Sequence, residues 1–159
     1  MPIAWVLAIW MWRTLWFRFI NGYIVMTQED KDLLLCDLCA RLPYGVKVQI
    51  KNEIVVLDSI CDDDGYHFNF IGEDREGVNI EQVRPYLVPL SSMTEEQKND
   101  CPIGETTLNI IKSNIGHGII EIPWRLSYIF IEWCNKNHFD YRGLIPKGLA
   151  IDATGLGIY

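Results

Sequence analysis

The sequence predicts an α+β domain, built from a small antiparallel β-barrel or meander with an N-terminal helix and a C-terminal helical cap. A leucine-rich segment with helical spacing begins at residue 28. Four or five short segments that alternate between apolar and polar residues follow within residues 46–90. A second apolar segment with helical spacing covers residues 123–137. The barrel would be SH3-like if its strands close on themselves.

The N-terminal helix is predicted at residues 28–42. Thr27 is a suitable N-cap residue, and Asp30 lies in the first turn, where acidic side chains favour the positive end of the helix. Pro43 ends the pattern, because proline interrupts a helix. A broad apolar face is formed by Leu34, Leu35, Leu38, Cys39 and Leu42.

A series of short strands is predicted after this helix. Alternating apolar residues place one face of each strand on the core. Residues 51–52 can form a tight turn, and the Asp-Gly pair at residues 64–65 favours a hairpin. Two prolines near the end of the series favour extended backbone. The predicted strands are residues 46–50, 53–60, 66–70, 78–80 and 83–90.

A short helix is predicted after Thr94, which can form a capping box with Gln97. The segment CPIG at residues 101–104 ends this helix. Beyond it, we expect a second hairpin. Its parts are a strand at residues 106–113, a loop at 114–118 and a returning strand at 119–122.

The C-terminal cap is predicted to be a buried helix at residues 123–137. Pro123 suits the first helical position. Trp133 is expected to be a core residue, because it continues an i, i+3, i+4, i+7 pattern. A short helical segment at residues 141–145 and an extended tail follow. The buried stripe comprises Leu126, Ile129, Phe130 and Trp133, and is widened by Trp124, Tyr128 and Ile131.

The first 25 residues differ from the rest of the chain, because they contain no acidic side chain and four of the six tryptophans. A membrane-spanning helix needs about 20 apolar residues, whereas Arg13 and Arg18 interrupt this segment. A signal peptide would have a basic start and a small-residue cleavage site. Three interpretations stay open: a spurious or dispensable extension before a start at Met26, an interfacial membrane anchor, or a packed helix. We expect the functional domain to be residues 26–159.

The net charge of −7 is unevenly distributed. Residues 26–100 carry 7 basic and 16 acidic side chains, which gives −9, whereas residues 101–159 carry 5 of each. This excess of acid argues against general nucleic-acid binding, which needs basic side chains to neutralise phosphates. It is compatible with a basic protein partner.

Five cysteines are scattered through the chain, and this odd number without a secretion signal predicts reduced thiols in the cytoplasm. Cys36 and Cys39 form a single CxxC motif inside the first helical pattern. A zinc site would need a second pair of ligands. We therefore expect these two thiols to be core or half-buried residues.

The segment HFDYR is the densest group of chemically versatile residues. His138 and Asp140 could ligate a metal or act as a base with its orienting carboxylate, and Arg142 could hold an anion. In the structural interpretation, His138 ends the helix, Asp140 caps the next turn, and Arg142 pairs with Asp140 or a carbonyl group. We expect a binding or capping cluster that includes Tyr141, with no bound metal, no cofactor and no assigned catalytic residue.

Other motifs give weaker signals. A metal site at HFDYR would need a third donor, such as His67 or His117. The loop GHG at residues 116–118 lacks the spacing of a phosphate-binding loop, and CDDDG at 61–65 lacks that of a calcium loop. Ser91 and its neighbour Ser92 are better explained as residues at the entry of a helix than as nucleophiles.

Several segments resemble a family of short uncharacterised bacterial proteins, which often lie near prophages or mobile elements. The resemblance covers nearly all of residues 26–159 and none of residues 1–25, and members typically begin at the equivalent of Met26. Cys134 and Asn137 depart from the usual pattern, in which leucine and histidine are expected. The segments are LCARLPYGVKV (38–48), VRPYLVPLSSMTEEQ (83–97), IEWCNKNHFDYRGLIPKGLAID (131–152) and the closing GIY.

This resemblance carries no assigned activity. Together with the composition, it leads us to expect a non-enzymatic protein-binding or accessory protein of prophage or mobile-element origin, acting in the cytoplasm. The first alternative is a small hydrolase or metal-dependent enzyme that uses His138 and Asp140. The second is an acidic decoy that mimics nucleic acid. The membrane would be a partner only if residues 1–25 are translated and used.

Overall fold

The computed structural model describes residues 26–62, 65–72, 77–114 and 124–159, except for the side chains of residues 114 and 124–126. Several expectations therefore lie outside the described residues: those for residues 1–25, Asp64, most of the loop at 114–118 with His117, the strand at 119–122, Pro123, and the side chains of Trp124 and Leu126. The assignment of 26–159 as the functional domain stays a prediction. Met26, the first described residue, is 4% exposed and packs in the core.

The first helix, α2 (Gln28–Arg41), confirms the predicted N-terminal helix. The Thr27 hydroxyl accepts a hydrogen bond from the Asp30 N–H at 3.1 Å, which satisfies one of the unpaired donors at the helix start. A short 3₁₀ turn, η1 (Leu42–Tyr44), contains the proline that interrupts the helix. Gly45 follows with a φ of +64°, a left-handed conformation that favours glycine.

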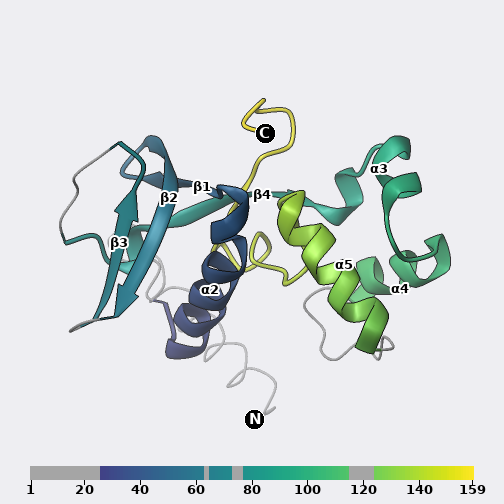
Figure 1. Cartoon of the computed structure of the whole chain (residues 1–159), viewed down its shortest axis with the longest axis horizontal. Coiled ribbons are helices and arrows are strands. Elements are labelled where there is room, and N and C mark those ends of the chain that lie inside the picture. The colour runs from purple at the N-terminus through teal and green to yellow at the C-terminus, as the bar shows by residue number, and fades with distance from the viewer. Residues whose placement is uncertain (1–25, 63–64, 73–76, 115–123) are drawn as a thin grey trace, which may run out of the picture.

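Six strands form one open sheet in the order β3-β2-β1-β4-β5, and β6 also pairs with β4 (Figure 1). β1 pairs antiparallel with β2 and β4, and β2 pairs antiparallel with β3. The two short C-terminal strands run parallel to β4. The strands are β1 (Lys47–Ile50), β2 (Glu53–Asp62), β3 (Tyr66–Phe70), β4 (Arg84–Pro89), β5 (Phe139–Asp140) and β6 (Ile151–Asp152).

The prediction of a closed, SH3-like barrel is not supported, because the sheet is open. Among the described strands, β3 pairs only with β2, and the other side of β4 pairs with β5 and β6 and not with β3. The predicted strand at residues 78–80 is also wrong. It leads into a 3₁₀ turn, η2 (Ile80–Gln82), whose capping box uses Asn79 and Gln82.

Three further helices are α3 (Glu95–Asp100), α4 (Glu105–Asn114) and α5 (Trp124–Lys136). The capping box of α3 is confirmed: Thr94 and Gln97 exchange hydrogen bonds at 2.8 and 3.2 Å. The strand predicted at residues 106–113 is wrong, since these residues belong to α4. The burial of Leu108 and Ile111 at helical spacing outweighs the β propensity of the segment. Residues 141–145 form turns and not the expected helical segment.

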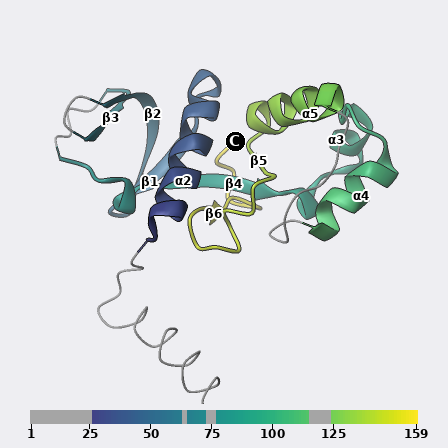
Figure 2. The same ribbon diagram turned by 90° about the horizontal axis from the view of Figure 1, so that it is seen from below.

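Two groups of buried apolar residues lie on either side of β4 (Figures 1 and 2). The sheet core lies where α2 packs on one face of β1–β3, and it includes Leu34, Leu38, Val48, Leu57 and Phe70. The helical core lies among α3, α4 and α5, and it includes Leu90, Leu108, Ile111, Phe130, Cys134 and Phe139.

The buried face of α5 differs from the expected stripe. Phe130 and Cys134 are buried, whereas Tyr128 is 65% and Ile129 is 49% exposed. Trp133 is half-buried; it packs on the helical core and donates a hydrogen bond from its indole nitrogen to Asp100 at 3.1 Å. Tyr128 and Ile129 were therefore placed on the wrong side of the helix. The apolar pattern of α5 is wider than the face that its neighbours cover.

The cysteines follow a different pattern from the expected one. Cys36 and Cys39 are both exposed on α2, so the prediction of core or half-buried thiols is wrong for this pair. Cys134 is completely buried, and burial raises the pKa of its thiol. It belongs to the helical core.

Candidate functional site

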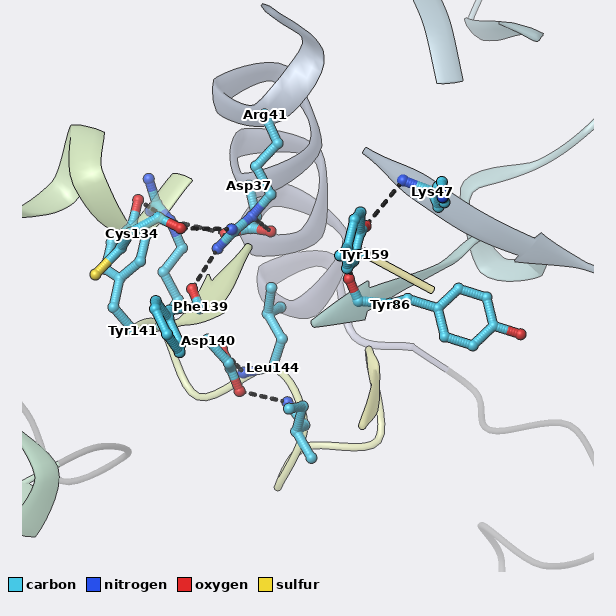
Figure 3. A network of polar contacts seen from close by, with 12 residues as sticks. Asp37, Arg41, Lys47, Tyr86, Cys134, Phe139, Asp140, Tyr141, Leu144 and Tyr159 are labelled. Atoms are coloured by element: carbon cyan, nitrogen blue, oxygen red, sulfur yellow. Dashed lines mark hydrogen bonds and ion pairs between the residues drawn. The ribbon is translucent and has the colours of Figure 1, made fainter. Parts of the chain in front are cut away.

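A network of polar contacts joins α2 to the region from the end of α5 to β5 (Figure 3). Its centre is a two-pronged ion pair between Asp37 and Arg41. Arg41 donates from Nε to Oδ2 at 2.7 Å and from Nη2 to Oδ1 at 3.1 Å. Both side chains are fully buried. Such a pair is stable in the interior only when its remaining hydrogen-bonding groups also have partners.

Arg41 uses its remaining donors to join the two cores. Its guanidinium donates to the carbonyl oxygens of Cys134 at 3.3 Å and Phe139 at 2.9 Å. Cys134 lies in the last turn of α5, where carbonyl groups have no partner within the helix. Arg41 of α2 thus supplies hydrogen-bond donors to a carbonyl group in the last turn of α5 and to the carbonyl group of the first residue of β5.

Tyr141 and Arg142 form the outer layer of this network. The Tyr141 ring lies 5.7 Å from the guanidinium carbon of Arg41 and 5.0 Å from that of Arg142. Arg142 also donates from Nε to the Tyr141 hydroxyl at 2.9 Å and lies 3.4 Å from the Asp37 carboxylate. The expected pairing of Arg142 with Asp140 or a carbonyl group is therefore wrong. Arg142 supports the buried carboxylate of α2.

Asp140 is a buried cap. Its two carboxylate oxygens accept hydrogen bonds from the N–H groups of Leu144 at 2.9 Å and Ile145 at 2.8 Å. Burial raises the pKa of this carboxyl group, and the two N–H donors oppose the shift. The structural interpretation of Asp140 is thus confirmed: it closes the turn after β5.

A cavity of about 270 Å³ lies beside Asp140. It is mostly apolar and is bordered by Ser91, in the 3₁₀ turn η3 (Leu90–Ser92) after β4, and by Lys112 of α4. His138 does not line it, so this cavity does not bring together the two residues of the enzyme interpretation. Its lining consists of Pro89, Leu90, Ser91, Lys112, Asp140, Ile145 and Pro146.

His138 ends α5, as the structural interpretation expected. Its backbone has a φ of +57°, and its N–H donates to the Asn135 carbonyl at 3.3 Å. The side chain is 7% exposed, and its Nδ1 atom is buried without a hydrogen-bond partner. The ring stacks on Tyr159, with centroids 3.8 Å apart and planes inclined by 11°. Burial, followed by the charges of Arg41 and Lys47, lowers the pKa of His138 to about 4.

His138 should make the protein less stable in acid. Because its pKa is near 4 when folded and about 6.5 when exposed, the unfolded chain binds the extra proton between these values. The free energy of unfolding should fall by about 3 kcal/mol as the pH drops from 6.5 to 4. Urea unfolding at several pH values measures this loss.

The control for this prediction is His138→Asn, because asparagine tolerates the left-handed conformation but does not titrate. This variant should show a flatter pH dependence over the same interval, whatever its stability at pH 7.5. If the free energy of unfolding of His138→Asn depends on pH as steeply as that of the wild-type chain, other groups cause the acid sensitivity.

Within the described ranges, no three His, Cys, Asp or Glu side chains gather at metal-binding distance. His67 is exposed on β3, whereas His138 is buried and stacks on Tyr159. The described helices are also too short or too polar to cross a bilayer.

Asp37 and Arg41, the centre of the network, were not among the residues singled out from the sequence. A signal for them was present, since Leu34, Asp37, Leu38 and Arg41 follow the i, i+3, i+4, i+7 pattern of a buried stripe. Two opposite charges on such a stripe indicate a buried pair, because an unpaired charge is very costly in the interior. Tyr159 gave no comparable signal.

The comparisons with known proteins found no family model, curated protein or solved structure that matches this chain.

Proposed function

We propose that this protein is a non-enzymatic protein-binding or accessory protein that acts in the cytoplasm on a basic protein partner. The observation that carries the proposal is an apolar patch on the side of the sheet that α2 leaves uncovered. We call this surface the outer sheet face; it comprises Ile54, Val56 and Ile71.

The outer sheet face follows from the alternation of side chains along β2. Val55 and Leu57 point into the sheet core, so Ile54 and Val56 point to the opposite side. Ile71 follows β3, and its N–H donates to the Val56 carbonyl at 3.0 Å. Ile54 is 53% and Ile71 is 62% exposed. The solvent face of an antiparallel sheet is usually polar, and contiguous exposed apolar side chains mark sites of association.

The charges on β2 indicate the kind of partner. Glu53, Asp58 and Asp62 are exposed on this strand, and the sequence continues with Asp63 and Asp64. Exposed acidic groups on the strand that carries the apolar patch favour a partner that has basic residues near an apolar contact, because complementary charges speed association and fix its orientation. This arrangement supports a protein partner more than a nucleic acid.

The two alternative functions have less support. The hydrolase would need His138 and Asp140 to be available, but Asp140 accepts two backbone hydrogen bonds and His138 is covered by Tyr159. The decoy would need its acidic groups on one face. The acidic side chains are instead divided between α2 and β2, and Asp30 of α2 is 3.4 Å from the ammonium of Lys147.

The resemblance to proteins encoded near prophages suggests where the partner comes from. An accessory protein of a mobile element would act on a partner from its host or from the element itself. The host in which the chain is encoded is therefore the source in which to search for the partner.

The proposal predicts that a charge on the outer sheet face abolishes partner capture. The full chain should retain a specific protein from a lysate of its native host, and Ile71→Lys should lose at least nine-tenths of it. Tyr128→Lys is the matched control, because Tyr128 is similarly exposed on α5, far from β3 in Figure 1. Quantitative mass spectrometry of the retained proteins measures the effect. Equal loss with both variants, or retention by Ile71→Lys, would contradict the proposal.

A further inference from the structure

The closing segment, residues 154–159, is attached to the sheet by the side chain of its last residue. The Tyr159 hydroxyl accepts a hydrogen bond from the Lys47 N–H at 3.0 Å. It also donates a hydrogen bond to the Tyr86 carbonyl at 3.0 Å (Figure 3). Both the donor and the acceptor of one phenol group are therefore used by backbone groups of β1 and β4.

This hydroxyl occupies a place in the sheet ladder. The paired residues of β1 and β4 are Val48 with Pro85 and Gln49 with Arg84. In the same register, Lys47 would be opposite Tyr86, but the hydroxyl lies between their backbone groups. A phenylalanine at this position would leave a backbone donor and an acceptor without partners, which is unfavourable in a partly buried site.

The ring of Tyr159 is recognised as well as its hydroxyl. It stacks on the buried ring of His138 with centroids 3.8 Å apart. The Lys47 ammonium lies 5.4 Å from the centre of the Tyr159 ring and donates to the Ile158 carbonyl. We call the site formed by Lys47, Tyr86 and His138 the tyrosine recess. It offers a flat aromatic surface, a cation, a donor and an acceptor, which together match a phenol.

The rest of the closing segment is held by few contacts. Leu156 is 56% exposed, and Tyr159 itself is 48% exposed. The Thr154 hydroxyl donates to the Ser92 hydroxyl at 3.2 Å. Gly155 and Gly157 have φ values of +73° and +62°, so the segment turns back on itself and does not join the sheet as a strand. Besides Tyr159, only the Ile158 carbonyl and the Thr154 hydroxyl of this segment have hydrogen bonds to β1, to β4 or to the turn after β4 among the contacts of the described residues, so the Tyr159 side chain is its main specific attachment.

The recess is continuous with the outer sheet face. Lys47 lies opposite Val56 in the β1–β2 pairing, so their side chains share one side of the sheet. A partner segment that covers Val56 and Ile71 would reach Lys47 next. This continuity favours a partner chain over a second copy as the source of an exchanging tyrosine.

We propose that the tyrosine recess is a binding site for a tyrosine side chain of a partner protein, and that residues 154–159 occupy it until that partner replaces them. The proposal rests on the proposed function and adds one requirement to it: the partner presents a tyrosine beside the contact made by the outer sheet face.

The test uses the full chain with Tyr159→Ala and, as probe, a synthetic peptide with the sequence of residues 154–159, TGLGIY. The peptide should bind this variant and should bind the wild-type chain at least tenfold more weakly, because Tyr159 fills the recess. A peptide with phenylalanine in place of the tyrosine should also bind the variant at least tenfold more weakly. Titrations followed by NMR shifts of the Lys47 amide measure both ratios. Tyr128→Ala is the control and should behave like the wild-type chain.

Equal binding to the wild-type chain and the Tyr159→Ala variant would overturn the proposal, as would equal binding of the two peptides. Concentration-dependent dimers of the wild-type chain that disappear in Tyr159→Ala would also overturn it, since a second copy would then fill the recess. The peptide should bind Tyr159→Ala equally well when Ile71→Lys is added. A failure of the peptide to bind would therefore contradict the tyrosine recess without affecting the result of the partner-capture experiment. The two proposals can fail separately.

Discussion

Replacing Arg41 with methionine is expected to lower the free energy of unfolding by about 3–5 kcal/mol, because it leaves the Asp37 carboxylate buried without its main partner. The same change removes the donors to the carbonyl groups of Cys134 and Phe139. For a chain of this size, the melting temperature should fall by about 10 °C or more. Thermal and urea unfolding followed by circular dichroism measure the loss.

Two further variants identify the cause. Arg41→Lys keeps the charge but cannot form the two-pronged contact, so it should lose much of the same stability. The double variant Asp37→Leu with Arg41→Met removes both charges and should be more stable than Arg41→Met alone. If Arg41→Met alone unfolds like the wild-type chain, the ion pair is not the connection between the two cores that its geometry indicates.

Replacing Phe139 with alanine is the second substitution with a large expected effect, about 3–5 kcal/mol of unfolding free energy. Phe139 is completely buried, and its ring lies 5.2 Å from that of Trp133 in the helical core. Its carbonyl accepts the hydrogen bond from Arg41, and its backbone pairs with Val88 of β4. A cavity here would loosen α5, β5 and the contact with α2 together.

Hydrogen exchange measured on Phe139→Ala tests whether the two cores unfold as one unit. If Arg41 couples them, amides of β1 in the sheet core should lose protection together with those of α5. Loss confined to α5 would show that the helical core unfolds alone. Tyr128→Ala, which removes an exposed side chain from the same helix, should stay within about 0.5 kcal/mol of the wild-type chain.

The local elements of this fold could be predicted from the sequence. Thr27 begins α2 and Thr94 begins α3, because each supplies the side-chain acceptor that a helix start requires. The alternation in residues 46–50 and 66–70 marked two of the strands, since it distinguishes the buried face of a sheet. These signals act over a few residues and need no knowledge of the rest of the chain.

Where the local signals of a segment were ambiguous, tertiary contacts decided its secondary structure. Residues 106–113 have the composition of a strand but form part of α4, where Leu108 and Ile111 reach the helical core. The sheet stays open because β4 pairs with residues 139–140 and 151–152, about 50 or more positions later in the chain. Pairing over such a separation leaves no periodic pattern in either segment.

For the candidate site, the sequence by itself determined the residue types and the local capping roles. His138 ends a helix and Asp140 caps a turn for reasons that lie within a few residues. Only the tertiary structure decided that Asp37 and Arg41 pair in the interior, that Arg142 supports them, and that Tyr159 fills a gap between Lys47 and Tyr86. The physical reason is that a buried polar group must find partners wherever the packed chain places them, and those partners come from distant segments.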